Sequence, residues 1–232
     1  MAALTISKEE EQRLKGLGFL NNKGTDNFSA RVITVNGKVT VAQHRCLADA
    51  AEKFGNGNLT FTTRLTVEVQ GIPYENIEAF REFIAKEGLT TGGTGPKVRP
   101  IVSCKGTTCQ YGLLDSFGIS EEIHHRFYVA YHDIKLPHKF KIAVGGCPNN
   151  CVKPNLNDLG IIGQRIPEFH KELCKGCKKC AIEEACPIGA SKVIDGVLVR
   201  DEEKCNHCGR CIGHCRFDSI VDGQYVIILT FD

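Results

Sequence analysis

The sequence predicts an α+β fold that carries a cysteine-rich, cluster-binding segment. Two observations lead to this prediction. Strand and helix signals alternate through the first ninety-odd residues, and eight of the 13 cysteines lie between Cys174 and Cys215. A β-hairpin, a helix, a strand and a second helix in succession are typical of an α+β unit. Cysteines crowded this closely, with no secretion signal before them, indicate metal rather than disulfides.

The first predicted elements are a β-hairpin and a helix, each indicated by a few neighbouring residues. Residues 30–42 contain Asn36-Gly37 between β-branched stretches, which predicts a β-hairpin. Residues 46–54 have helical composition and are followed by Gly55, a residue that commonly ends a helix. Together they supply the hairpin and the first helix of the α+β unit.

A strand and a second helix come next. Residues 59–70 alternate in the manner of a strand and are rich in Thr and Val. Pro73 then opens a predicted helix that has apolar residues on one face and ends at Gly88. The glycine-rich stretch 91–96 lacks the Lys-Ser/Thr of a phosphate-binding loop, so we interpret it as a linker.

The remaining elements are shorter. Residues 98–102 and 139–144 read as strands, and residues 121–132 read as a helix with acidic residues in its first turn. A final strand is expected at 224–231, after the cysteine-rich segment.

Composition and charge exclude several classes of protein. The net charge is +2, from 29 basic and 27 acidic residues, so no overall field favours nucleic acid or an acidic membrane surface. No apolar run approaches the roughly 20 residues needed to span a bilayer. Residues 1–19 read as a short charged helix rather than a targeting signal. We therefore expect a cytoplasmic protein without a nucleic-acid or membrane partner.

The eight clustered cysteines form a repeat with a period of 31 residues. Both copies are close to the run of cysteines that binds two [4Fe–4S] clusters in bacterial ferredoxins, where the fourth cysteine of each run ligates the other cluster. The zinc and disulfide alternatives do not use this triple spacing. Small residues in the loops, Gly176 and Gly209, are expected to let the backbone approach the sulfides. Cluster 1 is predicted on Cys174, Cys177, Cys180 and Cys215, and cluster 2 on Cys186, Cys205, Cys208 and Cys211.

Four more cysteines lie upstream, as the pairs Cys104/Cys109 and Cys147/Cys151. On their own they are compatible with zinc, a redox disulfide or buried core cysteines. The glycines before Cys147 and the turn Pro148-Asn149-Asn150 can present N–H groups to cluster sulfurs, which favours a third cluster.

Three stretches of sequence resemble sirohaem-dependent nitrite and sulfite reductases: TFTTRLTVEVQGI (60–72), SCKGTTCQYG (103–112) and KFKIAVGGCPNNC (139–151). The resemblance is greatest to the anaerobic and dissimilatory sulfite reductase type, which has an inserted two-cluster ferredoxin domain. It implies a ferredoxin-like half-domain (1–95), a sirohaem/[4Fe–4S] domain (96–165 and 224–232) and a 2[4Fe–4S] ferredoxin domain (166–223).

The resemblance also implies the roles of several site residues. A third [4Fe–4S] cluster would be held by Cys104, Cys109, Cys147 and Cys151, with Cys151 bridging to the sirohaem iron. Four basic residues would bind the substrate anion and the haem: Arg64, Arg99, Lys139 and Lys141. Fixed cations suit this role because both the substrates and the haem carboxylates are anionic.

Two functional hypotheses follow from the resemblance. The first is an enzyme that reduces sulfite to sulfide at a sirohaem, with electrons fed by the two ferredoxin clusters and nitrite as the alternative substrate. The second is a non-catalytic electron-transfer protein or subunit that has lost the sirohaem. The implied partners are an electron-donor protein or flavin- and iron–sulfur-bearing subunits, with self-association of the chain as an alternative.

Overall fold

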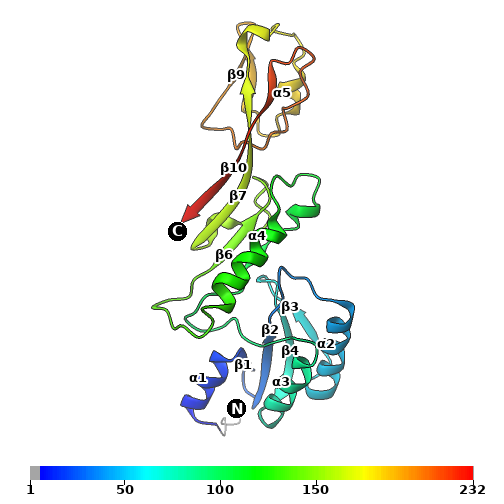
Figure 1. The fold of residues 1–232 in the computed structure, drawn as a ribbon, viewed down its shortest axis with the longest axis vertical. Helices are drawn as coiled ribbons and strands as arrows, with labels where there is room; N and C mark the ends of the chain where they lie inside the picture. The colour runs from blue at the N-terminus through cyan, green and yellow to red at the C-terminus, as the bar shows by residue number, and fades with distance from the viewer. Residues whose placement is uncertain (1–5, 232) are drawn as a thin grey trace. The chain divides into compact units, whose positions relative to one another are not determined.

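A computed structural model describes residues 6–231 and divides the chain into two compact units (Figure 1). The first unit comprises the residues up to Ser103 together with Gly118–Ala143. The second unit comprises Cys104–Phe117 and the residues from Val144 onward. In the part of the chain that is described, no helix is long and apolar enough to cross a membrane.

The first unit is built on a four-stranded sheet with the strand order β1-β2-β4-β3. Within it, β1 pairs with β2, β2 with β4, and β3 with β4, each pair antiparallel. Helices α2 and α3 contribute buried apolar side chains to the same core as the sheet. Its elements are α1 (Lys8–Gly16), β1 (Phe19–Asn21), β2 (Asn27–Val32), α2 (Val41–Phe54), β3 (Leu59–Phe61), β4 (Val67–Pro73) and α3 (Ile77–Ala85).

The core of this unit is organised around Phe80 of α3, which is fully buried. Its ring makes edge contacts with Phe19 and Phe54, with centroids 6.1 Å apart in each case. Edge-to-face aromatic pairs add to the free energy gained by burying the rings. The predicted apolar face of the second helix is therefore the face that closes this core.

Helix α2 begins earlier than the composition of residues 46–54 predicts. Thr40 forms a capping box with Gln43: the Thr40 hydroxyl accepts from the Gln43 N–H, and the Gln43 side chain accepts from the Thr40 N–H. This pair satisfies two N–H groups at the helix start. The helix ends at Phe54, before Gly55 as predicted.

The predicted single strand 59–70 is wrong, because the chain turns back within it. Strands β3 and β4 pair with each other, and Leu65 between them has a left-handed φ of 58°. Arg64 therefore lies in a turn rather than within a strand. The Asn36-Gly37 turn does form, with φ of 61° and 70°, but only one bridge, between Val35 and Lys38, flanks it.

The helix predicted at 121–132 has different bounds in the structure. The helical segment begins as α4 (Ser116–Ile123) and continues as a π-helix over His124–Val129. The predicted strand at 98–102 is reduced to β5 (Val102–Ser103), and the one at 139–144 is observed as β6 (Ile142–Gly145). One-turn 3₁₀ segments lie at Tyr74–Asn76, Gly106–Thr108, Pro154–Leu156 and Lys171–Leu173.

The second sheet has the strand order β10-β7-β6-β5. Its longest strands, β7 (Leu159–Phe169) and β10 (Ile220–Phe231), run antiparallel from the pair Phe169/Ile220 to the pair Leu159/Phe231 (Figure 1). The cysteine-rich segment lies between these two strands in the sequence. It contains helix α5 (Ala181–Ala185) and the hairpin of β8 (Ser191–Ile194) and β9 (Val197–Arg200).

Candidate metal centres

All 13 cysteines are free thiols, and 12 of them belong to the second unit. The remaining one, Cys46, lies on α2 and is buried in the core of the first unit. Across residues 6–231, no three His, Cys, Asp or Glu side chains gather as ligands of one metal ion.

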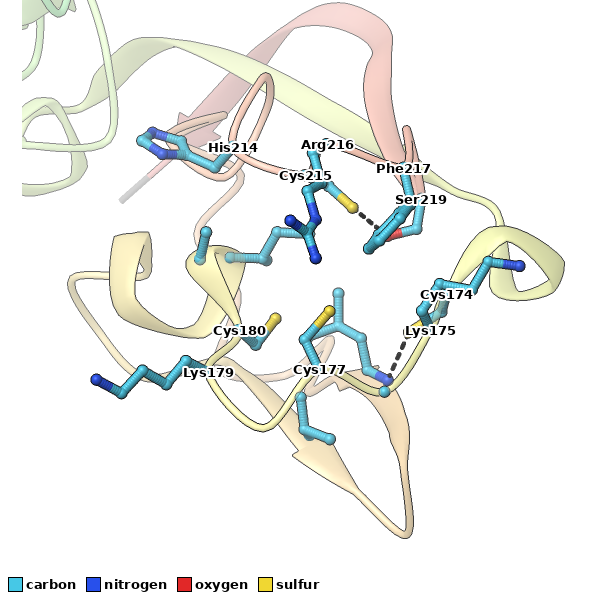
Figure 2. A pocket seen from close by; sticks show the side chains of 15 residues that line it. Cys174, Lys175, Cys177, Lys179, Cys180, His214, Cys215, Arg216, Phe217 and Ser219 are labelled. Atoms are coloured by element: carbon cyan, nitrogen blue, oxygen red, sulfur yellow. Dashed lines mark hydrogen bonds between the residues drawn. The ribbon is translucent and has the colours of Figure 1, made fainter.

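The structure brings Cys174, Cys177, Cys180 and Cys215 together, and we name them the first ferredoxin group. They line one cavity of about 330 Å³. Figure 2 shows Cys177 and Cys180 reaching into this cavity, with Cys215 across from them. The fourth residue therefore comes from the end of the second run of cysteines, 35 positions beyond Cys180.

Two of these sulfurs have hydrogen-bond partners that stabilise the thiolate form. The Leu198 N–H donates to the sulfur of Cys174 at 3.3 Å, and the Ser219 hydroxyl lies 3.0 Å from the sulfur of Cys215 (Figure 2). Burial alone would raise the pKa of Cys215, but hydrogen bonds from Ser219 and nearby backbone outweigh it, so the pKa is lowered. Groups that stabilise a thiolate also suit it as an iron ligand.

A second ferredoxin group comprises Cys186, Cys205, Cys208 and Cys211, which line a separate cavity of about 20 Å³. This cavity is nearly closed, so a cubane would require the four side chains to move apart. Burial raises the pKa of Cys211 to about 11, and it is also the largest cause of the raised pKa of Cys205. Iron would have to displace these protons on binding. Cys186 differs, because several backbone N–H groups lower its pKa despite burial.

Both runs of cysteines use a left-handed residue immediately before their second cysteine. Gly176 has φ of 56° and His207, 31 residues later, has φ of 53°. A Cβ atom on Gly176 would lie 2.0 Å from the Gly196 carbonyl oxygen, and one on Gly209 would lie 2.8 Å from the Arg165 side chain. Close packing against the protein is thus a reason for glycine at both positions that the sequence did not reveal.

The remaining four cysteines, Cys104, Cys109, Cys147 and Cys151, are named the reductase group. Cys104 follows β5, and its sulfur accepts a hydrogen bond from the Gly146 N–H at 3.1 Å. Burial raises the pKa of Cys147, and the other three thiols of the group raise it further. Those electrostatic contributions indicate that Cys104, Cys109 and Cys151 each lie near Cys147.

Glycines make the approach of the two cysteine-bearing loops possible. A Cβ atom on Gly106 would lie 2.7 Å from the Cα of Gly146, and one on Gly146 would lie equally close to Gly106. After Cys147 the chain turns sharply, with left-handed φ values of 57° at Asn150 and 47° at Lys153. The predicted turn after Cys147 is therefore present.

The four predicted anion-binding residues all belong to the first unit. Arg64 donates from its Nη2 to the carbonyl oxygens of Pro100, at 2.7 Å, and Ile142, at 3.2 Å. Lys141 directly precedes β6. In this structure Arg64 thus connects the segments that lead to Arg99 and Lys141, a role that the sequence did not suggest.

Arg99 and Lys139 line one basic cavity of about 310 Å³, together with Lys15 and Lys97. None of the described residues that line it is acidic. Arg99 donates from Nη1 to the Gly93 carbonyl oxygen, and burial, then the charge of Arg31, lowers its pKa. Cations that lack a facing carboxylate attract anions, so this cavity fits an anionic group such as a carboxylate or an oxyanion. The place of Lys15 and Lys97 in this cavity could not be predicted from the sequence, because neither lysine belongs to a motif.

We expect Arg64→Lys to lower the free energy of unfolding by about 1.5–3 kcal/mol, since a charged donor shared by two carbonyls is lost and lysine cannot reproduce its planar geometry. Urea denaturation measures this change. Arg81→Lys is the matched control, because Arg81 makes an i,i+3 ion pair with Glu78 on a helix surface, and we expect an effect below about 0.5 kcal/mol. Equal effects in the two variants would contradict a structural role for Arg64.

The fold and the three cysteine groups define an iron–sulfur protein with a two-run ferredoxin segment attached to a larger α+β framework. Comparison with protein families agrees. Residues 21–87 match the nitrite/sulfite reductase ferredoxin-like half domain, residues 94–181 match the nitrite and sulphite reductase 4Fe-4S domain, and residues 198–221 match a 4Fe-4S binding domain. The chain belongs to the nitrite and sulfite reductase family.

Individual relatives are consistent with this assignment. The chain is 37% identical over 145 residues to the coenzyme F420-dependent sulfite reductase of Methanocaldococcus jannaschii, a match that covers 62% of this chain and 22% of the relative. It is 32% identical over 172 residues to an anaerobic sulfite reductase subunit of Salmonella typhimurium, covering 66% of this chain and 49% of the relative. The chain thus spans less than half the length of either relative.

A solved structure confirms the α+β fold. Dissimilatory sulfite reductase I superposes with a TM-score of 0.65 at 18% identity, covering 88% of this chain and 54% of that one. At this identity the similarity concerns the fold. The predicted combination of a ferredoxin-like half-domain, a 4Fe-4S domain and a ferredoxin motif is confirmed.

Proposed function

We propose that this chain reduces sulfite to sulfide, using a sirohaem coupled to one [4Fe–4S] cluster and supplied with electrons by two ferredoxin clusters. The observation that carries the proposal is the grouping of 12 cysteines into three sets of four within a chain built from reductase domains. Each set has the ligand number that a cubane requires.

The proposed ligands follow the three groups. The first ferredoxin group would hold one cluster and the second another, with Cys186 and Cys215 exchanged between the two runs of cysteines. The arrangement around separate cavities supports this exchange. The reductase group would hold the third cluster, and the Gly146 N–H would donate to a ligand sulfur there and tune the potential.

The residues of the first unit fit an anionic tetrapyrrole and an oxyanion substrate. When bound, the sirohaem would supply the iron at which the substrate is reduced, and Cys151 would link that iron to the reductase cluster. Arg99 and Lys139 would hold anionic groups in the basic cavity. Lys139 and Lys141 would also donate hydrogen bonds and protons to oxygen atoms that leave as water. Arg64 would position the segments that carry Arg99 and Lys141.

Nitrite is the alternative substrate, because it is also a small anion that such cations bind. An electron-donor protein or a flavin- and iron–sulfur-bearing subunit would reduce the ferredoxin clusters. This partner is suggested by the relatives that are named as subunits of sulfite reductases. We propose a cytoplasmic, anaerobic setting, since cubanes are sensitive to oxidation.

Metal analysis and an absorption spectrum test the proposal together. Protein produced in a sirohaem-making host and purified anaerobically should contain about 12 iron atoms in its clusters, four for each cysteine group. A band in the Soret region and another in the red would mark the sirohaem. About eight iron atoms without those bands would instead support an electron-transfer protein that binds no sirohaem. Zinc as the main metal would refute the cluster assignments.

A further inference from the structure

The second ferredoxin group and the reductase group approach each other at one cavity of the second unit. This cavity has a volume of about 250 Å³ and is lined by both Cys147 and Cys208. It also shares Cys208, Gly209 and Arg210 with the small cavity of the second ferredoxin group. One predicted ligand of each cluster, Cys147 and Cys208, therefore faces a common space.

Arg210 connects the two cysteine-bearing loops across this space. It lies between Cys208 and Cys211, and its Nη2 donates to Oδ1 of Asn149, which lies between Cys147 and Cys151, at 3.1 Å. Its guanidinium also lies 4.4 Å from the centre of the Tyr111 ring. Arginine is suited to such a position because its planar group can donate hydrogen bonds and stack on an aromatic face together.

The backbone beside Arg210 is fixed by β7. The Arg165 N–H donates to the His207 carbonyl oxygen at 2.9 Å, and the Gln164 side chain donates to the Asn206 carbonyl oxygen at 3.3 Å. Arg165 itself makes a bidentate ion pair with Asp222 of β10, at 2.8 and 2.7 Å. The cysteine loop that carries Arg210 is therefore attached to the long strand pair and is not a free loop.

The first ferredoxin group has no comparable connection within residues 6–231. The described residues that line its cavity all fall between Cys174 and Ser219, and none of them lines the 250 Å³ cavity. The residue equivalent to Arg210 in the 31-residue repeat is Lys179, which is exposed and lines the first cavity. The two copies of the repeat thus differ at the position where one of them contacts the reductase loop.

We propose that the cluster of the second ferredoxin group is the direct electron partner of the reductase cluster, and that Arg210 is the positioning residue that holds the two together. This inference rests on the proposed function, since it requires both clusters. With both clusters bound, the reduced second ferredoxin cluster would give up one electron and the reductase cluster would accept it, with no bond made or broken. The first ferredoxin cluster would take one electron from a one-electron donor and pass it to the second.

The test is electron paramagnetic resonance of the fully reduced, iron-replete protein, combined with rapid-freeze kinetics. In the wild-type protein the reductase cluster signal should be broadened by a reduced neighbour. Arg210→Ala should diminish this broadening. It should also lower the rate at which reduced methyl viologen reduces the reductase cluster, by about tenfold or more, since small displacements of reacting centres have large effects on rate. The iron content should remain unchanged.

Lys179→Ala is the matched control, because it removes a basic residue at the same position of the other repeat, and it should change neither the broadening nor the rate. Asn149→Ala should reproduce the effect of Arg210→Ala, and the double variant should be no worse than either single variant, as expected for two residues in one contact. Wild-type behaviour of Arg210→Ala, or an equal loss in Lys179→Ala, would overturn the inference. A wild-type iron content of about eight would instead refute the third cluster, and with it the proposed function.

Discussion

Cys186→Ser is expected to remove the second ferredoxin cluster, about four of the iron atoms in the protein, and to leave the first cluster in place. The reason is spatial. Cys186 follows the first run of cysteines in sequence, yet it lines the cavity of Cys205, Cys208 and Cys211. Its sulfur accepts a hydrogen bond from the Ala190 N–H at 3.1 Å, which orients it there. Iron and sulfide analysis of anaerobically purified protein measures the loss.

Paired substitutions decide which cluster Cys186 serves. The double variant Cys186→Ser/Cys205→Ser should lose no more iron than either single variant, because both residues would belong to one cluster. Combining Cys186→Ser with Cys174→Ser should cost about twice as much, since two clusters would be lost. The reverse pattern would show that each run binds its own cluster. Cys46→Ala, in the core of the first unit, is the control that should retain all the iron.

Cys151→Ser is expected to remove the reductase cluster and the sirohaem bands together, because this residue would ligate the one and link it to the other. Cys151 is exposed, unlike the other three cysteines of the reductase group, which are partly buried. Its replacement should therefore disturb the surrounding core little. Total iron should fall by about five atoms, four from the cluster and one from the sirohaem, and sulfite-dependent oxidation of reduced viologen should fall to background.

Lys139→Ala separates substrate binding from cofactor content. Lys139 is an exposed residue of the basic cavity, so its removal should preserve iron content and spectrum while it weakens sulfite turnover, by about tenfold or more for the loss of a charged hydrogen bond. Loss of the bands in Lys139→Ala, or their retention in Cys151→Ser, would contradict the roles proposed for these two residues.

The α+β class and the grouping of the ferredoxin cysteines were predictable because both depend on short-range spacing. Two-residue gaps force three thiols around one point, and the repeat of 31 residues identified the two loops. Helix ends were also predictable where glycine was the signal, as at Gly55. These features are encoded within a few residues of where they act.

Features that depend on contacts distant in sequence could not be predicted in this way. The turn that places Arg64 between β3 and β4 contains no glycine, and a left-handed Leu65 is unusual for a residue with a bulky side chain. Arg210 and Asn149 are 61 residues apart, and each is a non-ligand position between two cluster cysteines, so neither spacing nor residue type pairs them. A comparison of the two repeats, in which Lys179 corresponds to Arg210, could have drawn attention to that position.

The pairing of β7 with β10 has a consequence for the cysteine-rich segment. Phe169 and Ile220 are cross-strand partners, so the segment between them leaves and re-enters the sheet at neighbouring points. A segment with adjacent ends can be gained, lost or exchanged without rerouting the rest of the chain, since the strands themselves close the loop. The cysteine-rich segment is therefore inserted at a single place in the second sheet, where a change in its length or sequence leaves the pairing of β7 with β10 intact.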